Sequence, residues 1–162
     1  MPSTEASRNA NEVSVNEAIA ATPETLYDLV SDVTNISRWS PENTGCRWAG
    51  GATRPSVGAR FRGANRRGWR RWSTTCTVRE AEPGRRFAFD VRYFLFPISR
   101  WTYEFAPDGA GTRVTESWAD RRPWFMARVL APTVMGVRDQ ATFNREQIKG
   151  TLSALKRFAE SS

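Results

Sequence analysis

The feature that most constrains the fold is the stretch from Gly45 to Asp120, where apolar and polar side chains alternate with a period of two. The runs are rich in aromatic and β-branched residues, and no long helical pattern interrupts them. This pattern is typical of strands with one covered face, linked as consecutive antiparallel hairpins. Turn sequences with Gly or Pro at 65–68, 82–84 and 107–109 separate some of the runs. The predicted strands span about 45–48, 59–65, 69–81, 85–93, 99–106 and 112–120.

A strand and a short helix are predicted before this region, and a longer helix after it. The period of two from Val13 to Ala20 indicates a first strand, and Thr22 with Pro23 then forms a helix-capping sequence. A helical apolar stripe runs over 137–159, and Asn144 interrupts it. The apolar connector at 124–135 allows two interpretations, a lid over a cavity or a short helix packed on the sheet.

The length of 162 residues fits a single domain, which we expect to span 13–159 after a disordered tail at 1–12. Neither a membrane-spanning run nor a secretory signal is apparent, so we expect a cytoplasmic protein. Two cysteines, Cys46 and Cys76, are too few for a disulfide framework. Reduced thiols are the favoured interpretation, and a structural bridge is the alternative.

The chain contains no histidine, which removes the usual general base and the most common metal ligand. No glycine-rich phosphate loop or zinc-protease motif occurs either, so we expect neither a cofactor nor a metal. The net charge of +7 raises nucleic acid or an anionic membrane as partners. However, 22 of the 24 basic residues are arginines spread over every segment, and this dispersion argues against nucleic acid.

Several local patterns, in their order along the chain, resemble the START-like superfamily, specifically its polyketide cyclase/dehydrase and lipid-transport branch. The resemblance covers about 13–159 and rests on order and spacing, because each pattern is weak by itself. The patterns are Pro23, Leu-Val-Ser-Asp at 29–32, Trp-Ser-Pro at 39–41, Val-Gly-Ala-Arg-Phe at 57–61, Glu-Pro-Gly-Arg-Arg-Phe-Ala-Phe at 82–89, Trp-Thr-Tyr-Glu-Phe at 101–105, Gly-Thr-Arg-Val-Thr-Glu at 111–116 and Leu-Ser-Ala-Leu-Lys at 152–156.

This resemblance implies an α+β helix-grip fold, in which a curved antiparallel sheet wraps around a long C-terminal helix and encloses a cavity. Binding or carriage of a small hydrophobic molecule, lipid-like or aromatic, is the first hypothesis for function. A polyketide cyclase or dehydratase using acid–base residues in the cavity is the alternative. Whether the chain is an enzyme stays open, with a binding role favoured, because one fold hosts many functions.

Strand alternation predicts which side chains face the cavity. The predicted ligand-binding residues are mostly aromatic, as ligand pockets require, although plain core packing is the competing interpretation for each. They are Phe61, Trp72, Phe87, Phe89, Trp101, Tyr103, Glu116 and Trp118, and Thr74, Cys76, Val91, Phe105 and Val114 share their parity.

Glu116 and Tyr103 are the candidate catalytic residues. Glu116 lies between Val114 and Trp118 on the inward parity, where an unpaired carboxylate is costly to bury. It could bind a ligand hydroxyl or act as a general base with a raised pKa. The alternatives are an ion pair with an arginine or a bulge that turns the side chain outward. Tyr103 could donate a hydrogen bond in the same space.

The segment 65–72, Asn-Arg-Arg-Gly-Trp-Arg-Arg-Trp, interleaves basic and aromatic residues. Through Arg66, Arg67, Arg70 and Arg71 it could bind phosphates or a membrane surface, with Trp69 at the interface. A solvated hairpin tip is the competing interpretation. Contact with anionic surfaces or nucleic acid is therefore the second alternative for function.

Overall fold

Seven β-strands pair side by side in the computed structural model, which describes residues 11–125 and 140–161. Every pair is antiparallel, and the order across the sheet is β1-β7-β6-β5-β4-β3-β2. The strands are β1 (Glu12–Ile19), β2 (Asn43–Ala49), β3 (Arg60–Arg67), β4 (Arg70–Glu82), β5 (Arg86–Tyr93), β6 (Phe96–Asp108) and β7 (Gly111–Asp120).

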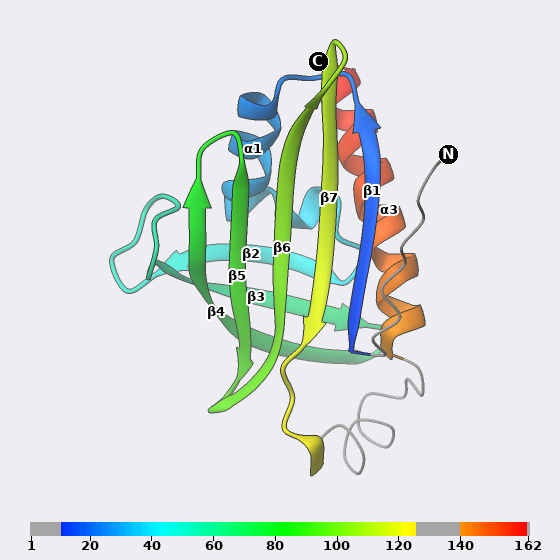
Figure 1. Cartoon of the computed structure of the whole chain (residues 1–162). Coiled ribbons are helices and arrows are strands. Elements are labelled where there is room, and N and C mark those ends of the chain that lie inside the picture. The colour runs from blue at the N-terminus through cyan, green and yellow to red at the C-terminus, as the bar shows by residue number, and fades with distance from the viewer. Residues whose placement is uncertain (1–10, 126–139, 162) are drawn as a thin grey trace.

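The chain enters at one edge of the sheet, crosses to the other and returns by hairpins. After β1, two short helices carry the chain to β2 at the far edge, and β3 to β7 then follow as neighbours until β7 pairs with β1. Figure 1 shows the sheet curving strongly, with β2 and β3 running crosswise to β6 and β7. Because the two edges bend toward the same side, the sheet acquires a concave face.

Local signals in the sequence explain the two short helices. α1 (Pro23–Ser31) begins with proline at its first position, and the Thr22 hydroxyl accepts a hydrogen bond from the Thr25 amide at 3.2 Å. The 3-10 helix η1 (Val33–Arg38) is capped by Asp32, whose carboxylate accepts from the Thr34 amide at 3.1 Å. Both helices therefore begin where capping side chains satisfy their first amides.

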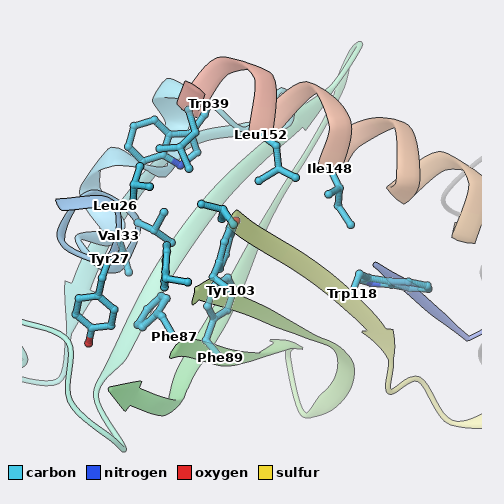
Figure 2. Close-up of a cluster of buried hydrophobic side chains, with 14 of the residues drawn as sticks. Leu26, Tyr27, Val33, Trp39, Phe87, Phe89, Tyr103, Trp118, Ile148 and Leu152 are labelled. Atoms are coloured by element: carbon cyan, nitrogen blue, oxygen red, sulfur yellow. The ribbon is translucent and has the colours of Figure 1, made fainter. Parts of the chain in front are cut away.

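The long helix α3 (Gln140–Glu160) packs against β1 and β7 and closes the concave face. Figure 2 shows Ile148 and Leu152 pointing from α3 toward the sheet, where Tyr103 and Trp118 face them. Ile148 and Leu152 are almost completely buried. Burying apolar area in this way is the main stabilising contribution to the grip of the sheet on the helix.

The predicted α+β helix-grip fold is confirmed, and the predicted strands all occur, with ends that differ by a few residues. One turn was placed wrongly: it lies at Gly68-Trp69, not at 65–68, because β3 and β4 stay paired as far as Arg67 and Arg70. Gly68 has a φ of +62°, which glycine adopts without strain.

Parts of three sequence predictions lie outside the described residues. These are positions 1–10 of the predicted tail, 126–135 of the predicted lid, and 137–139 at the start of the predicted last helix. Residue 12 of the predicted tail already belongs to β1. None of the helices over 11–125 and 140–161 is long and apolar enough to cross a bilayer.

Candidate functional site

A cavity of about 180 Å³ lies between the concave face of the sheet and α3. This is the size of cavity that accommodates a molecule of one or two rings. Aromatic side chains from β3, β4, β5, β6 and β7 form much of its wall, and α3 contributes mainly polar residues. The sheet residues on this wall include Phe61, Trp72, Thr74, Cys76, Phe89, Val91, Trp101, Tyr103, Glu116 and Trp118.

The structure brings together nearly all of the residues selected by parity. Seven of the eight predicted ligand-binding residues line the cavity, and Phe87 does not. Phe87 is fully buried and packs edge-on against Tyr27 of α1, with ring centroids 6.4 Å apart. Phe105 and Val114 are likewise buried and do not line the cavity. These three belong to the buried core, where Phe87 and Phe105 pack against Tyr27 of α1. They fall outside the cavity wall because parity selects a face of a strand but not a position along it.

Glu116 points into the cavity wall and is 2% exposed. It lies directly opposite Tyr103 across the β6–β7 pair, and the Tyr103 hydroxyl donates a hydrogen bond to its Oε1 at 2.8 Å. The other oxygen, Oε2, is buried and has no hydrogen-bond partner. Neither alternative weighed for Glu116, an arginine ion pair or an outward bulge, is present among the described residues.

Burial raises the pKa of Glu116 from 4.5 to about 8, and the hydrogen bond from Tyr103 offsets this only in part. Burial also raises the pKa of Tyr103 well above its ordinary value, and the neighbouring Glu116 adds to the effect. Arg67 carries the only positive charge among the described residues that line the cavity, and it pairs with Glu42. Near pH 7, Tyr103 and Glu116 therefore form a neutral, hydrogen-bonded pair.

Sequence reasoning missed a polar group at the other side of the cavity, contributed by β2 and β3. Asn43 Nδ2 donates to Cys46 Sγ at 3.2 Å, and Asn43 Oδ1 is buried without a partner. Both residues line the cavity, as does Gly63, which pairs with Cys46 across the β2–β3 ladder. A Cβ on Gly63 would approach Thr74 Oγ1 to 3.2 Å, so the missing side chain leaves room for this group.

Both cysteines are free and line the cavity, so no disulfide joins them. Burial raises the pKa of both thiols, which keeps them protonated at neutral pH. The described residues contain no cluster of three or more acidic or cysteine side chains that could hold a metal ion.

Sequence and structure comparisons show which known proteins this chain resembles. The family described as "Polyketide cyclase / dehydrase and lipid transport" matches residues 11–160. The chain belongs to this family. A polyketide-cyclase-like protein of Corynebacterium glutamicum, solved in solution, is 31% identical, with 92% of this chain and 91% of that one covered and a TM-score of 0.64. No protein among the curated ones matches the sequence.

Two more distant structures show the fold alone. A START superfamily protein of Mycobacterium smegmatis is 18% identical at a TM-score of 0.71, and the match covers 93% of this chain and 98% of that one. A protein of Chromobacterium violaceum is 16% identical at 0.69, with 94% and 99% covered. Together, family and fold indicate a ligand-binding or polyketide-cyclase-type function.

Arg67 is a partly exposed residue on the cavity wall of this polyketide cyclase/dehydrase family member. The Arg67 guanidinium donates to Glu42 Oε1 and lies over two rings, 4.2 Å from the centroid of Phe143 and 5.7 Å from that of Trp72. Its side chain is 23% exposed. The hairpin arginines therefore differ: Arg67 lies on the cavity wall, whereas Arg66 and Arg71 are exposed.

Asn144 is the polar residue that interrupts the apolar stripe of α3, and it lines the cavity. The Gln140 side chain donates to its Oδ1 at 3.3 Å. A buried asparagine on the inner face of a helix was the sequence signal that this face meets a polar space rather than a continuous core.

Proposed function

We propose that the protein binds or carries a small, largely apolar molecule in this cavity and holds one polar group of the ligand at Glu116. The observation that carries the proposal is the partnerless Oε2 of Glu116, fully buried in an aromatic-walled cavity. Leaving a buried polar atom unsatisfied costs about 1–3 kcal/mol. A ligand that hydrogen-bonds to this atom recovers that cost, which fits the pattern of apolar pockets with a few placed polar groups.

A variant that fills the cavity tests this function. Thr151 is buried, lines the cavity and lies on α3, so Thr151→Phe places a ring in the ligand space. We expect the variant to lose at least tenfold in affinity for tetralin, a two-ring hydrocarbon, measured by quenching of tryptophan emission. Lys149→Phe places the same ring on the exposed side of the helix and should leave the affinity unchanged.

Mass spectrometry of small molecules extracted from gently purified protein gives a second measurement. A co-purifying apolar molecule that is depleted from Thr151→Phe but not from Lys149→Phe supports the proposal. Equal binding of tetralin by wild type and Thr151→Phe would contradict it, because the ligand would then lie outside the cavity.

A second candidate function is acid–base catalysis of the cyclase or dehydratase type, and the pKa of about 8 at Glu116 favours it. In a β-hydroxyketone, the Glu116 carboxylate would remove the proton next to the carbonyl. The hydroxyl on the β-carbon would leave with a proton from Tyr103 as water, and the double bond would form between the two carbons. Incubation with 4-hydroxy-4-phenylbutan-2-one, followed by enone absorbance, tests this step.

Catalysis by Glu116 predicts a rate that rises with pH and levels off above about 8, because the base must be ionised. Glu116→Gln should abolish this rate. A rate that is unchanged in Glu116→Gln would remove the carboxyl from the chemistry.

A further inference from the structure

In the Tyr103–Glu116 pair, the structure indicates which group donates the hydrogen bond and which accepts it. The Tyr103 hydroxyl lies 2.8 Å from Glu116 Oε1, and no arginine or lysine of the described residues contacts either side chain. An isolated carboxylate in an apolar site takes up a proton rather than remain charged. The neutral pair then contains two O–H groups and only one internal hydrogen bond.

One O–H is therefore left without a partner inside the pair, whichever of the two residues donates, and both side chains line the cavity. When Tyr103 donates to Oε1, the proton of the neutral acid belongs on Oε2, the atom without a partner. A free donor requires an acceptor on the ligand. We propose that the cavity selects apolar molecules that carry a carbonyl oxygen, such as ketones, because this oxygen accepts the single free O–H of the Tyr103–Glu116 pair; the inference rests on the proposed function.

Other titratable groups around the cavity do not compete for this role. The thiols of Cys46 on β2 and Cys76 on β4 have raised pKa values because of burial and are weak donors. On the cavity wall, Arg67 is paired with Glu42. The cavity-lining residues of α3 in the described part of the chain carry no charge.

A matched pair of probes tests whether the cavity prefers a ligand that accepts a hydrogen bond. α-Tetralone and tetralin share a two-ring frame, and only the ketone has an acceptor. At pH 6.5 we expect α-tetralone to bind about five- to tenfold more tightly, the range that one hydrogen bond supplies. The preference should shrink at pH 9, where Glu116 ionises and repels the ketone oxygen.

Two variants separate the effect of the hydrogen-bond donor from the effect of cavity shape. Glu116→Gln keeps an N–H donor facing the cavity, so it should retain the preference for the ketone and lose its pH dependence. The double variant Glu116→Leu with Tyr103→Phe removes every O–H of the pair. It should lose the preference, so that α-tetralone and tetralin bind with equal affinity.

The outcomes test the carbonyl preference separately from the proposed function, which is ligand binding in the cavity. Equal affinity of wild type for both probes at pH 6.5 would overturn the carbonyl preference while ligand binding stands. A preference that grows with pH would overturn it as well, because the carboxylate would then be acting as an acceptor. Failure of both probes to bind would contradict the proposed function itself.

A separate observation concerns the surface at the end of the sheet where β5 meets β6. The β5–β6 turn consists of Phe94 and Leu95, which are 79% and 85% exposed. Phe94 has a φ of 53°, a conformation that favours asparagine or glycine and costs a bulky residue roughly 1 kcal/mol or more. Two apolar side chains are thus exposed to solvent in this turn, and the backbone of Phe94 is strained.

Further exposed aromatic residues lie at the same end. Because β6 and β7 are antiparallel, the residues after β7 emerge at the end where β5 meets β6. Figure 1 shows the β5–β6 turn and the segment after β7 at the bottom of the view. Trp124 and Phe125 are both exposed. We call Phe94, Leu95, Trp124 and Phe125 the aromatic rim.

Charge indicates which partner fits the aromatic rim. Arg92 and Arg121 are exposed on the segments that carry it. The acidic residue nearby, Asp120, is already paired with Arg122. Tryptophan and phenylalanine beside unneutralised arginines are the composition that binds the interface of an anionic bilayer.

We infer that the aromatic rim docks on anionic membranes, with Phe94 and Leu95 entering the headgroup region. The test replaces the strained residue by one that suits its conformation, in the double variant Phe94→Gly with Leu95→Ser. This variant should be at least as stable as wild type because glycine adopts the positive φ at position 94 without strain, and a two-residue turn with positive φ at its first position favours Gly-Ser. It should nevertheless lose most of its co-sedimentation with vesicles of phosphatidylcholine and phosphatidylglycerol.

Val57 is 70% exposed in the loop between β2 and β3, so Val57→Ser is the matched control and should sediment as wild type does. Binding should fall when salt is raised and when phosphatidylglycerol is omitted. Absence of wild-type sedimentation together with a dimer in analytical ultracentrifugation would overturn the inference in favour of a second copy. Vesicle or DNA binding that is unaffected by the turn variant would overturn it in favour of arginine contacts alone.

Discussion

Replacing Glu116 by glutamine should remove most of the pH dependence of stability that this one carboxyl creates. In the folded protein burial raises its pKa to about 8, whereas in the unfolded chain it titrates near its ordinary value of 4.5. Between these values the unfolded state has lost the proton and the folded state retains it. The stability contribution of the neutral carboxyl is therefore complete below pH 4.5 and is lost as the pH rises to about 8.

The magnitude follows from 1.36 kcal/mol for each pH unit between the two values. From pH 5 to pH 8 the wild-type protein should lose roughly 4 kcal/mol of unfolding free energy through this group. Glutamine does not titrate, so Glu116→Gln loses none of it. Any fixed cost of the new amide hydrogens is the same at every pH and does not alter the slope.

Urea unfolding followed by tryptophan fluorescence at pH 5, 6.5 and 8 measures the effect. Subtracting the two proteins cancels the other titrating groups, which they share. Glu146→Gln alters a carboxyl that is 66% exposed and should leave the pH dependence unchanged. A difference between wild type and Glu116→Gln that stays constant over the three pH values would refute the assignment of a neutral, buried carboxyl.

Three further substitutions test the frame around the cavity. Leu152→Ala should lower the unfolding free energy by about 2–5 kcal/mol because the side chain is 1% exposed, whereas Lys149→Ala on the outer side should stay within about 0.5 kcal/mol in urea unfolding. Gly111→Ala should destabilise clearly in thermal unfolding, since a Cβ there lies 2.4 Å from a β1 carbonyl oxygen, while Gly45→Ala meets nothing within 4 Å. Tyr103→Phe should cost about 1–3 kcal/mol, because it strands a buried acceptor, and should move the carboxyl titration seen by NMR to still higher pH.

Local sequence determined much of the fold because its signals act over a few residues. The period of two assigned Tyr103, Glu116 and Trp118 to one face of their strands, and all three do share the concave face. The proline and threonine at the start of α1 set that helix by capping geometry alone. Such signals need no knowledge of distant segments.

Sequence did not reveal how far along each strand the cavity extends. Phe87 and Phe89 have the same parity, yet Phe87 is core beneath α1 and Phe89 lines the cavity. The position of α1 across the strands decides this difference, and that position follows from packing over the whole sheet.

The environment of Glu116 was also decided by the tertiary structure alone. Parity turned the carboxyl inward but left an arginine partner as a serious alternative, in a chain with 22 arginines. The register of the β6–β7 pair placed the Tyr103 hydroxyl 2.8 Å from Glu116, while Arg67, on β3 next to the other edge strand, was engaged by Glu42. Which charges meet across a curved sheet depends on contacts between segments far apart in sequence, and these are fixed only when the fold forms.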